Sequence, residues 1–212
     1  MTKDELARLR ELGVATVYEA SGRQGLIDMP LIQLLPGSRV AGPARTVLCG
    51  QDDNLMVHAV IEQIQPGEVL VLSMPEPSPV ALIGELLVTQ VKVRGAAGIL
   101  VDAAVRDAEE LAELGLPIWT RFVRVRGATK IKLGQLNATV SVGGAQVSAA
   151  DILILDSDGA VCVKQDRVAE VLRASEARLE KEAQLREKLQ AGELSYDLHG
   201  LREVVEKGRR RS

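Results

Sequence analysis

Three charged residues of this chain have the types and the spacing of a small active site. Glu85 is followed, after twenty residues, by the adjacent pair Arg106-Asp107. Carboxylates bind hard divalent cations such as Mg²⁺ or Mn²⁺, and the planar fork of an arginine binds a carboxylate through two hydrogen bonds. If the chain folds so that the two ends of this segment meet, these side chains indicate a site for a divalent cation and an anionic substrate.

Each of the three residues also has a simpler structural explanation. Asp107 precedes a predicted helix, where an aspartate often serves only as the N-cap. Glu85 follows Gly84 at the expected N-terminal part of another helix, where a carboxylate complements the helix dipole. For Arg106 the simpler explanation is a surface ion pair with Asp102, Glu109 or Glu110. The residues alone leave these alternatives open.

Backbone groups near Glu85 offer a second means of binding an anion. The first N–H groups of a helix have no acceptor within it, so the amides of Leu86 and Leu87 are free to bind one. Together with Gly84 and Arg106, they form the predicted substrate-binding set.

The hydrophobic pattern predicts the elements that position these groups. Residues 80–94 are expected to form a helix, Gly98–Val101 a buried strand, and Asp107–Leu114 a second helix ending at Gly115. Because the strand returns along the preceding helix, the crossover brings Glu85 towards Arg106-Asp107.

The rest of the chain reads as further helices and strands of one domain. Thr2 and Glu5 have the spacing of a capping box, and the helix that they open ends at Gly13. Further predicted elements are helices at 14–20 and 54–64, a strand at 69–72, short strands at 138–142, 146–147, 152–155 and 160–163, and a long charged helix from about 167 to 190. Gly-Gly and Asp-Gly turns between the late strands are typical of hairpins. The order predicts an α/β fold with a mixed sheet.

Composition excludes several classes of protein. The chain has 212 residues, a net charge of −3 and only 2% aromatic residues, which argues against a nucleic-acid-binding protein with a basic face and stacking platforms. Cys49 and Cys162 lie in apolar runs and are expected to be buried, reduced thiols. No apolar window has the length of a transmembrane helix and the start has no signal core, so we expect a cytoplasmic protein that does not bind a membrane.

Several other polar residues carry weaker signals. Asn54 either caps the helix that follows it or borders the site, and the sequence does not separate these roles. His58 has the position of a packed or surface histidine rather than a catalytic one. Lys92 and Lys130 have no setting that favours a Schiff-base nucleophile.

The motifs of the chain resemble those of the RraA-like family, most closely its class II, metal-dependent aldolases for 4-hydroxy-4-methyl-2-oxoglutarate (HMG) and 4-carboxy-4-hydroxy-2-oxoadipate (CHA). Those enzymes carry an acidic residue, twenty intervening residues and then Arg-Asp. The resemblance covers nearly the whole chain. It includes LPGSRVAGPARTV (35–47), Asp53-Asn54, PGEVLVLS (66–73), GGAQVSAADILILDSDGAVCV (143–163) and LREKLQAGELSYDL (185–198).

The resemblance implies roles for individual residues. Asp107 would be the metal ligand, and Glu85 would hold the ion through water. Arg106 and the amides of Leu86 and Leu87 would bind the pyruvyl part of the substrate. A glutamate from the C-terminal helix of a neighbouring subunit approaches the metal in these aldolases, and Glu182 is the best match for it.

The resemblance also implies a fold, an assembly and an activity. The fold would be a single swivelling-domain-like (α/β/β) domain over 1–212, with 167–212 packing on a neighbour in a homotrimer or hexamer. The activity would be Mg²⁺- or Mn²⁺-dependent cleavage of a 4-hydroxy-2-oxo acid to pyruvate and a second oxo acid, with oxaloacetate decarboxylation alongside. The alternative is a non-enzymatic RraA-type regulator of ribonuclease activity that acts by binding protein. Such a regulator lacks the acid after the arginine, so Asp107 favours the enzyme.

Overall fold

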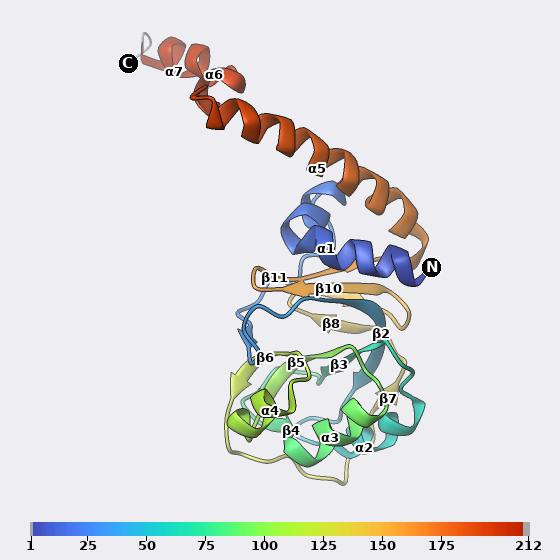
Figure 1. Cartoon of the computed structure of the whole chain (residues 1–212). Helices are drawn as coiled ribbons and strands as arrows, with labels where there is room; N and C mark the ends of the chain where they lie inside the picture. The colour runs from blue at the N-terminus through green and yellow to red at the C-terminus, as the bar shows by residue number, and fades with distance from the viewer. Residues whose placement is uncertain (1, 210–212) are drawn as a thin grey trace. The chain divides into compact units, whose positions relative to one another are not determined.

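The computed structural model of the protein describes residues 2–209, which form two compact units divided between Ser175 and Glu176. The larger unit is built on a mixed sheet. Figure 1 shows helices α2 (Leu55–Val60), α3 (Glu85–Val93) and α4 (Ala108–Leu114) on one side of its parallel strands. The prediction of an α/β fold with a mixed sheet and a long C-terminal helix is confirmed.

Four parallel strands form the centre of the sheet. Their order is β6 (Ile118–Val123), β5 (Gly98–Val105), β3 (Val69–Ser73) and β2 (Val40–Leu48). Every residue of β3 and β5 is buried, as expected for parallel strands covered on both faces.

Alternate residues of β3 enter two different cores. Leu70 and Leu72 pack in the cluster that includes residues of α2, α3 and α4, whereas Val69 and Val71 pack in the cluster on the other face. Because successive side chains of a strand point to opposite faces, a continuous apolar run is needed to fill both.

The second face is covered by antiparallel strands. The first half of β2 pairs with β10 (Ile152–Asp156), and β10 pairs with β11 (Gly159–Val163) through an Asp-Gly turn. Strands β8 (Val140–Val142) and β9 (Ala145–Val147) form a separate hairpin at Gly143-Gly144. Two further short strands pair at other places in the sheet: β1 (Ile32–Gln33) with β6, and β7 (Gln135–Leu136) with β2.

The N-terminal helix confirms the predicted capping box and joins the two predicted helices into one kinked element. In α1 (Lys3–Ala20), the Thr2 hydroxyl accepts a hydrogen bond from the Glu5 amide, and the Glu5 carboxylate accepts one from the Thr2 amide. Gly13, at φ 78°, breaks the helical path. The Val14 amide donates to Asp156 Oδ2 at 2.9 Å, so the kink is tied to the end of β10.

The prediction of a helix over 80–94 is wrong at its start. Residues Ala81–Ile83 form strand β4, which pairs in parallel with the end of β5, and α3 begins only at Glu85. The apolar residues of 80–83 fit a buried strand as well as a helix, and local periodicity does not separate the two. Pairing with β5 decides the outcome.

Both cysteines are buried, as the sequence predicted. Burial raises the pKa of the Cys49 thiol to about 12, with a further contribution from the charge of Asp53. The pKa of Cys162 is also raised to about 12, first by burial and then by Asp151. Both thiols therefore stay protonated and unreactive at neutral pH.

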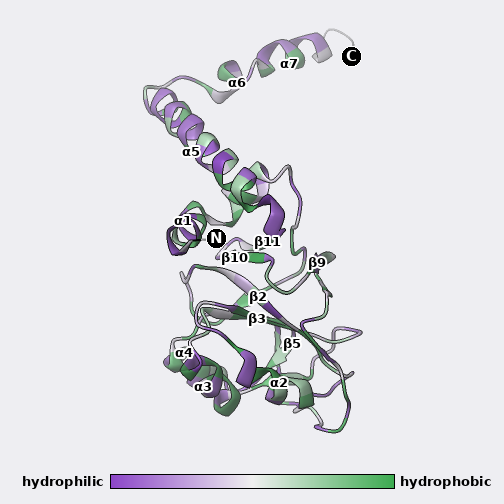
Figure 2. Cartoon of the chain, turned by 90° about the vertical axis from the view of Figure 1, so that its right-hand side faces the viewer, coloured by the Kyte–Doolittle hydropathy of each residue, from purple (hydrophilic) through white to green (hydrophobic). Residues whose placement is uncertain are grey.

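The smaller unit is helical. It contains most of α5 (Val168–Gln190), together with α6 (Ser195–Leu198) and α7 (Leu201–Arg209). Figure 2 shows α5 as largely hydrophilic along its length. Within residues 2–209, no helix is both long enough and apolar enough to cross a membrane. The packing of 167–212 on a neighbouring subunit stays a prediction.

The buried carboxylate of Asp53 holds the loop at Thr129–Lys132 in place. Asp53 is fully buried; its Oδ1 accepts from the Leu55 amide at 2.8 Å, and its Oδ2 accepts from the Thr129 hydroxyl and the amides of Ile131 and Lys132 at 2.6–3.1 Å. Burial alone would raise the pKa of Asp53. Hydrogen bonds from Ile131, Thr129, Leu55 and Lys132 outweigh burial and lower this pKa below its ordinary value.

We expect Asp53→Ala to lower the free energy of unfolding at pH 7 by about 3 kcal/mol, because several buried donors lose their acceptor. A lowered folded-state pKa stabilises the protein above the unfolded pKa, about 4, and this stabilisation is lost as pH falls towards the folded value. The difference between parent and variant should therefore shrink below pH 4. Urea denaturation at pH 7 and pH 3.5 measures it, with Asp158→Asn at the exposed β10–β11 turn as control. A difference that grows in acid would contradict this account.

Candidate active site

The site forms where β4 and β5 end side by side. Since the two strands are parallel, their carboxyl ends lie at the same edge of the sheet. The Arg106 amide donates to the Ile83 carbonyl at 3.1 Å, which joins the two chain ends. Gly84 follows β4 and Asp107 follows β5, and both open helices. The predicted convergence of Glu85 and Arg106-Asp107 is present.

Asp107 stands at the N-cap position of α4 but does not cap that helix. Its backbone is left-handed, at φ 60° and ψ 45°, and its side chain makes no cap hydrogen bond. Instead, Asp107 Oδ2 accepts a hydrogen bond from the Glu85 amide at 3.0 Å. Asp107 is therefore not a simple N-cap. It adopts a strained backbone conformation, and its side chain contacts the Glu85 amide on the other side of the site.

The missing side chain of Gly84 keeps the space beside this carboxylate open. A Cβ at Gly84 would collide with Asp107 Oδ2 and lie 3.0 Å from Arg106 Cγ. Gly84 also supplies no side-chain cap to α3. The Leu86 and Leu87 amides in the first turn of α3 thus have the character of anion-binding donors.

The Arg106 side chain lines the pocket and is partly exposed. Its Nε lies 3.7 Å from Asp107 Oδ2, and its side chain is 51% exposed. The alternative pairing with Asp102 is wrong, because Asp102 is buried and its Oδ1 lies 2.5 Å from Arg121 Nε. The Arg106 fork is available to a substrate carboxylate.

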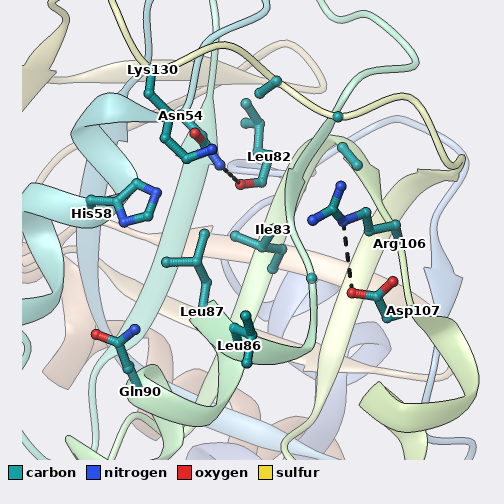
Figure 3. Close-up of a pocket in the computed structure, with 14 residues that line it drawn as sticks. Asn54, His58, Leu82, Ile83, Leu86, Leu87, Gln90, Arg106, Asp107 and Lys130 are labelled. Atoms are coloured by element: carbon teal, nitrogen blue, oxygen red, sulfur yellow. Dashed lines mark hydrogen bonds and ion pairs between the residues drawn. The ribbon is translucent and has the colours of Figure 1, made fainter.

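A pocket of about 290 Å³ lies over these groups. Figure 3 shows Arg106 and Asp107 at one end, Asn54 and His58 at the other, and Leu87 between them. A volume of this size suits a small organic acid and excludes a dinucleotide. Apolar walls strengthen the few polar contacts by excluding water.

Sequence reasoning missed part of the lining. Gly127, Ala128 and Lys130 line the pocket from the loop that Asp53 holds in place. This loop has no periodicity, and its contact with the site depends on Asp53, far away in sequence. Asn54 borders the site, as one of its two predicted roles required, and makes no side-chain cap for α2.

Two predicted metal-site residues lie outside the pocket lining. Glu85 Oε1 accepts from the Thr89 hydroxyl at 2.9 Å, within α3. Glu182 belongs to the smaller unit, where its carboxylate pairs with Arg178 Nε at 2.8 Å. Their roles at a metal stay predictions.

Asp107 fits a metal that is held mainly by water. Over residues 2–209 there is no cluster of three or more His, Cys, Asp or Glu side chains able to hold an ion. Mg²⁺ keeps several of its waters and is commonly bound by only one or two carboxylates. The exposed Asp107 carboxylate and the open space at Gly84 meet that requirement.

Two known proteins resemble most of the chain in sequence or structure. A protein of Halalkalibacterium halodurans, provisionally named 4-hydroxy-4-methyl-2-oxoglutarate aldolase, is 26% identical over 175 residues, or 82% of this chain and 83% of that protein. The crystal structure of Streptomyces coelicolor RraAS2, described as an unusual member of the RNase ES inhibitor RraA family, is 29% identical. It covers 88% of this chain and 97% of its own, with a TM-score of 0.76.

A third relative shows the fold alone. The crystal structure of an uncharacterized protein from Pseudomonas syringae is 22% identical, covers 92% of this chain and 96% of its own, and has a TM-score of 0.79.

The sequence profile of the RraA-like family, described as Aldolase/RraA, matches residues 14–162, which include both chain ends of the site. The match spans more than half of the sequence, and the chain belongs to the RraA-like family.

Proposed function

We propose that the protein is a divalent-metal-dependent aldolase that cleaves a 4-hydroxy-2-oxo acid of the HMG or CHA type to pyruvate and a second oxo acid. The observation that carries the proposal is the convergence of Asp107, Arg106 and the first turn of α3 on one pocket. These groups offer a carboxylate for a cation, a guanidinium for an anion and backbone donors for a second anionic oxygen. The provisional name of the Halalkalibacterium halodurans relative supports the same activity.

The chain's residues would hold the pyruvyl half of the substrate. Arg106 binds the C1 carboxylate, and the amides of Leu86 and Leu87 orient it. A base takes the proton of the C4 hydroxyl, the C3–C4 bond breaks, and its electron pair forms the pyruvate enolate while C4 becomes a carbonyl. A proton then adds to C3. Positive charge from Arg106 stabilises the enolate as it forms.

Mg²⁺ or Mn²⁺ bound at Asp107, with Glu85 and Glu182 of a neighbouring subunit as further predicted partners, would polarise the 2-oxo group as a Lewis acid. The same enolate results when oxaloacetate loses CO₂. Oxaloacetate decarboxylation is therefore the expected second activity.

A regulator of ribonuclease activity is the second candidate. It is favoured by the likeness to Streptomyces coelicolor RraAS2, which is described within a family of RNase ES inhibitors. A regulator that acts only by binding protein needs neither a metal ion nor turnover. Metal-dependent turnover therefore separates the two candidates.

The surroundings of the pocket favour a second copy of the chain as partner. Leu86 lines the pocket, and its side chain is 76% exposed. Three more apolar side chains, which are 79–88% exposed, lie close in sequence to other lining residues: Val125, Ile131 and Leu133. Large apolar side chains at such exposure are typical of surfaces that become covered on assembly. A homotrimer, or a dimer of trimers, would cover them.

We expect pyruvate release from HMG, CHA or oxaloacetate in the presence of Mg²⁺, and its loss with EDTA. Asp107→Asn should lower kcat/KM at least about a hundredfold, since the amide carries no charge for the cation. Glu109→Gln, a neighbouring exposed carboxylate on α4, is the matched control and should behave like the parent. If none of the three compounds is turned over, and ribonuclease activity falls on addition of the protein, the regulator is the correct candidate.

Gly84→Ala should abolish turnover while leaving the melting temperature nearly unchanged. Its backbone is extended, which suits alanine, but the added methyl group would collide with Asp107 Oδ2. The Asp107 side chain is partly exposed and can move away, which leaves the fold intact but displaces the carboxylate from the site. Steady-state kinetics and thermal unfolding of the same preparation measure both effects. Gly208→Ala, with open space around the residue, serves as control. Full activity in Gly84→Ala would place the substrate elsewhere.

Analytical ultracentrifugation should give three or six times the chain mass. Ile131→Lys and Leu133→Lys together should lower that mass, because lysine opposes burial of the loop against another copy. Asp158→Lys, at the exposed β10–β11 turn, is the control. A monomeric parent protein would contradict the proposed assembly.

A further inference from the structure

The Arg106 side chain reaches into the pocket without a close ion pair to hold it. Its charged partner among the described residues is Asp107, whose Oδ2 lies 3.7 Å from Arg106 Nε (Figure 3). Two other arginines of the sheet, Arg45 and Arg121, have carboxylate partners at 2.6 and 2.5 Å. A long side chain loses rotamer freedom when it is ordered, so Arg106 needs another constraint to keep one orientation.

Gly127 stands against the tip of this side chain. A Cβ at Gly127 would lie 3.1 Å from Arg106 Nη1, which is closer than ordinary van der Waals contact. Apart from the chain neighbours of Gly127, no other described atom lies within 4 Å of that position. The φ angle of Gly127 is outside the left-handed range, so its backbone conformation does not itself require glycine. The missing side chain therefore matters to Arg106 and to little else.

Gly84 stands against the same side chain nearer its base. A Cβ at Gly84 would lie 3.0 Å from Arg106 Cγ and 3.1 Å from Arg106 Nε. Arg106 thus lies along two backbone segments, first at Gly84 and then at Gly127. Contact with backbone on this scale limits the directions in which the guanidinium fork can point.

Strand β4 sets the position of both glycines. Its first residue, Ala81, makes an isolated parallel bridge with Gly127, and the Ala81 amide donates to the Arg126 carbonyl at 2.7 Å. Gly84 follows the last residue of the same strand. The segment after Gly127 is held by hydrogen bonds to the buried Asp53 carboxylate. The backbone at both glycines is therefore anchored by the protein itself.

We infer that Gly127 is a positioning residue for Arg106: its backbone and its lack of a side chain set the direction in which the guanidinium meets the substrate carboxylate. The inference deepens the proposed aldolase function and rests on it. An arginine binds a carboxylate best through two parallel hydrogen bonds, which demands a defined orientation of the fork. Because Gly127 is exposed, a side chain there changes this orientation without disturbing either core.

The first test compares side chains of equal size and different charge at position 127 in the Mg²⁺-loaded protein. We expect Gly127→Asn to lower kcat/KM for pyruvate release about tenfold, because the amide displaces the fork. Gly127→Asp should lower it about a hundredfold, mainly through KM, since its carboxylate pairs with Arg106 and competes with the substrate. Both variants should melt like the parent. Gly208→Asp, with open space around the residue, is the control and should keep full activity.

The second test is a double-mutant cycle that asks whether position 127 acts through Arg106. Arg106→Lys keeps the positive charge but ends before the position of Nη1, so a side chain at 127 has no fork to displace. Gly127→Ala should lower kcat/KM about fivefold in the parent, and less than about twofold in the Arg106→Lys background. Steady-state kinetics of the four proteins measure the coupling.

Equal losses in Gly127→Asn and Gly127→Asp, or single losses that multiply in the cycle, would overturn the positioning role and leave the aldolase function standing. A fall in melting temperature that parallels the loss of activity would also overturn it, because the substitution would then act on the fold. A parent protein that releases pyruvate from none of HMG, CHA and oxaloacetate would reject the proposed function, and this inference with it.

Discussion

Parallel pairing of β4 with β5 is the constraint on which the candidate site depends. It places Gly84 and Asp107 at the same edge of the sheet, and the hydrogen bond from the Glu85 amide to Asp107 Oδ2 joins them. Without this pairing, Arg106-Asp107 and the first turn of α3 would be unrelated polar groups. The left-handed backbone of Asp107 and the absence of a Cβ at Gly84 are compatible with this close approach, because a Cβ at Gly84 would collide with Asp107 Oδ2.

Two apolar cores support that edge and explain the composition of the chain. Residues of β3 and β5 alternate between the helix-covered face and the hairpin-covered face. Aliphatic side chains fill both cores, with Trp119 as the one large aromatic among the fully buried side chains of residues 2–209. A rigid, doubly covered sheet leaves the strand ends and their loops to carry the chemistry, as is general for parallel sheets.

A polar frame completes the pocket from a distant part of the chain. Asp53 binds the loop at Thr129–Lys132, while Asn54 binds Leu82 of β4. The adjacent residues therefore connect three segments around one cavity. The polar atoms of these two buried side chains have hydrogen-bond partners among the described residues, except for Asn54 Oδ1.

The sequence by itself determined the apolar strands, the capping box at Thr2–Glu5, the late hairpins and the long helix, because each has a local periodicity or turn signal. It also determined that Glu85 and Arg106-Asp107 could meet. It could not distinguish a strand from a helix at Ala81–Ile83, since a short apolar run suits both. Only the tertiary structure decided that Asp102 pairs with Arg121, that Asp107 accepts from Glu85 rather than capping α4, and that Lys130 and Asn54 line the same pocket. Those contacts join residues far apart in sequence, and the pairing of strands brings them together.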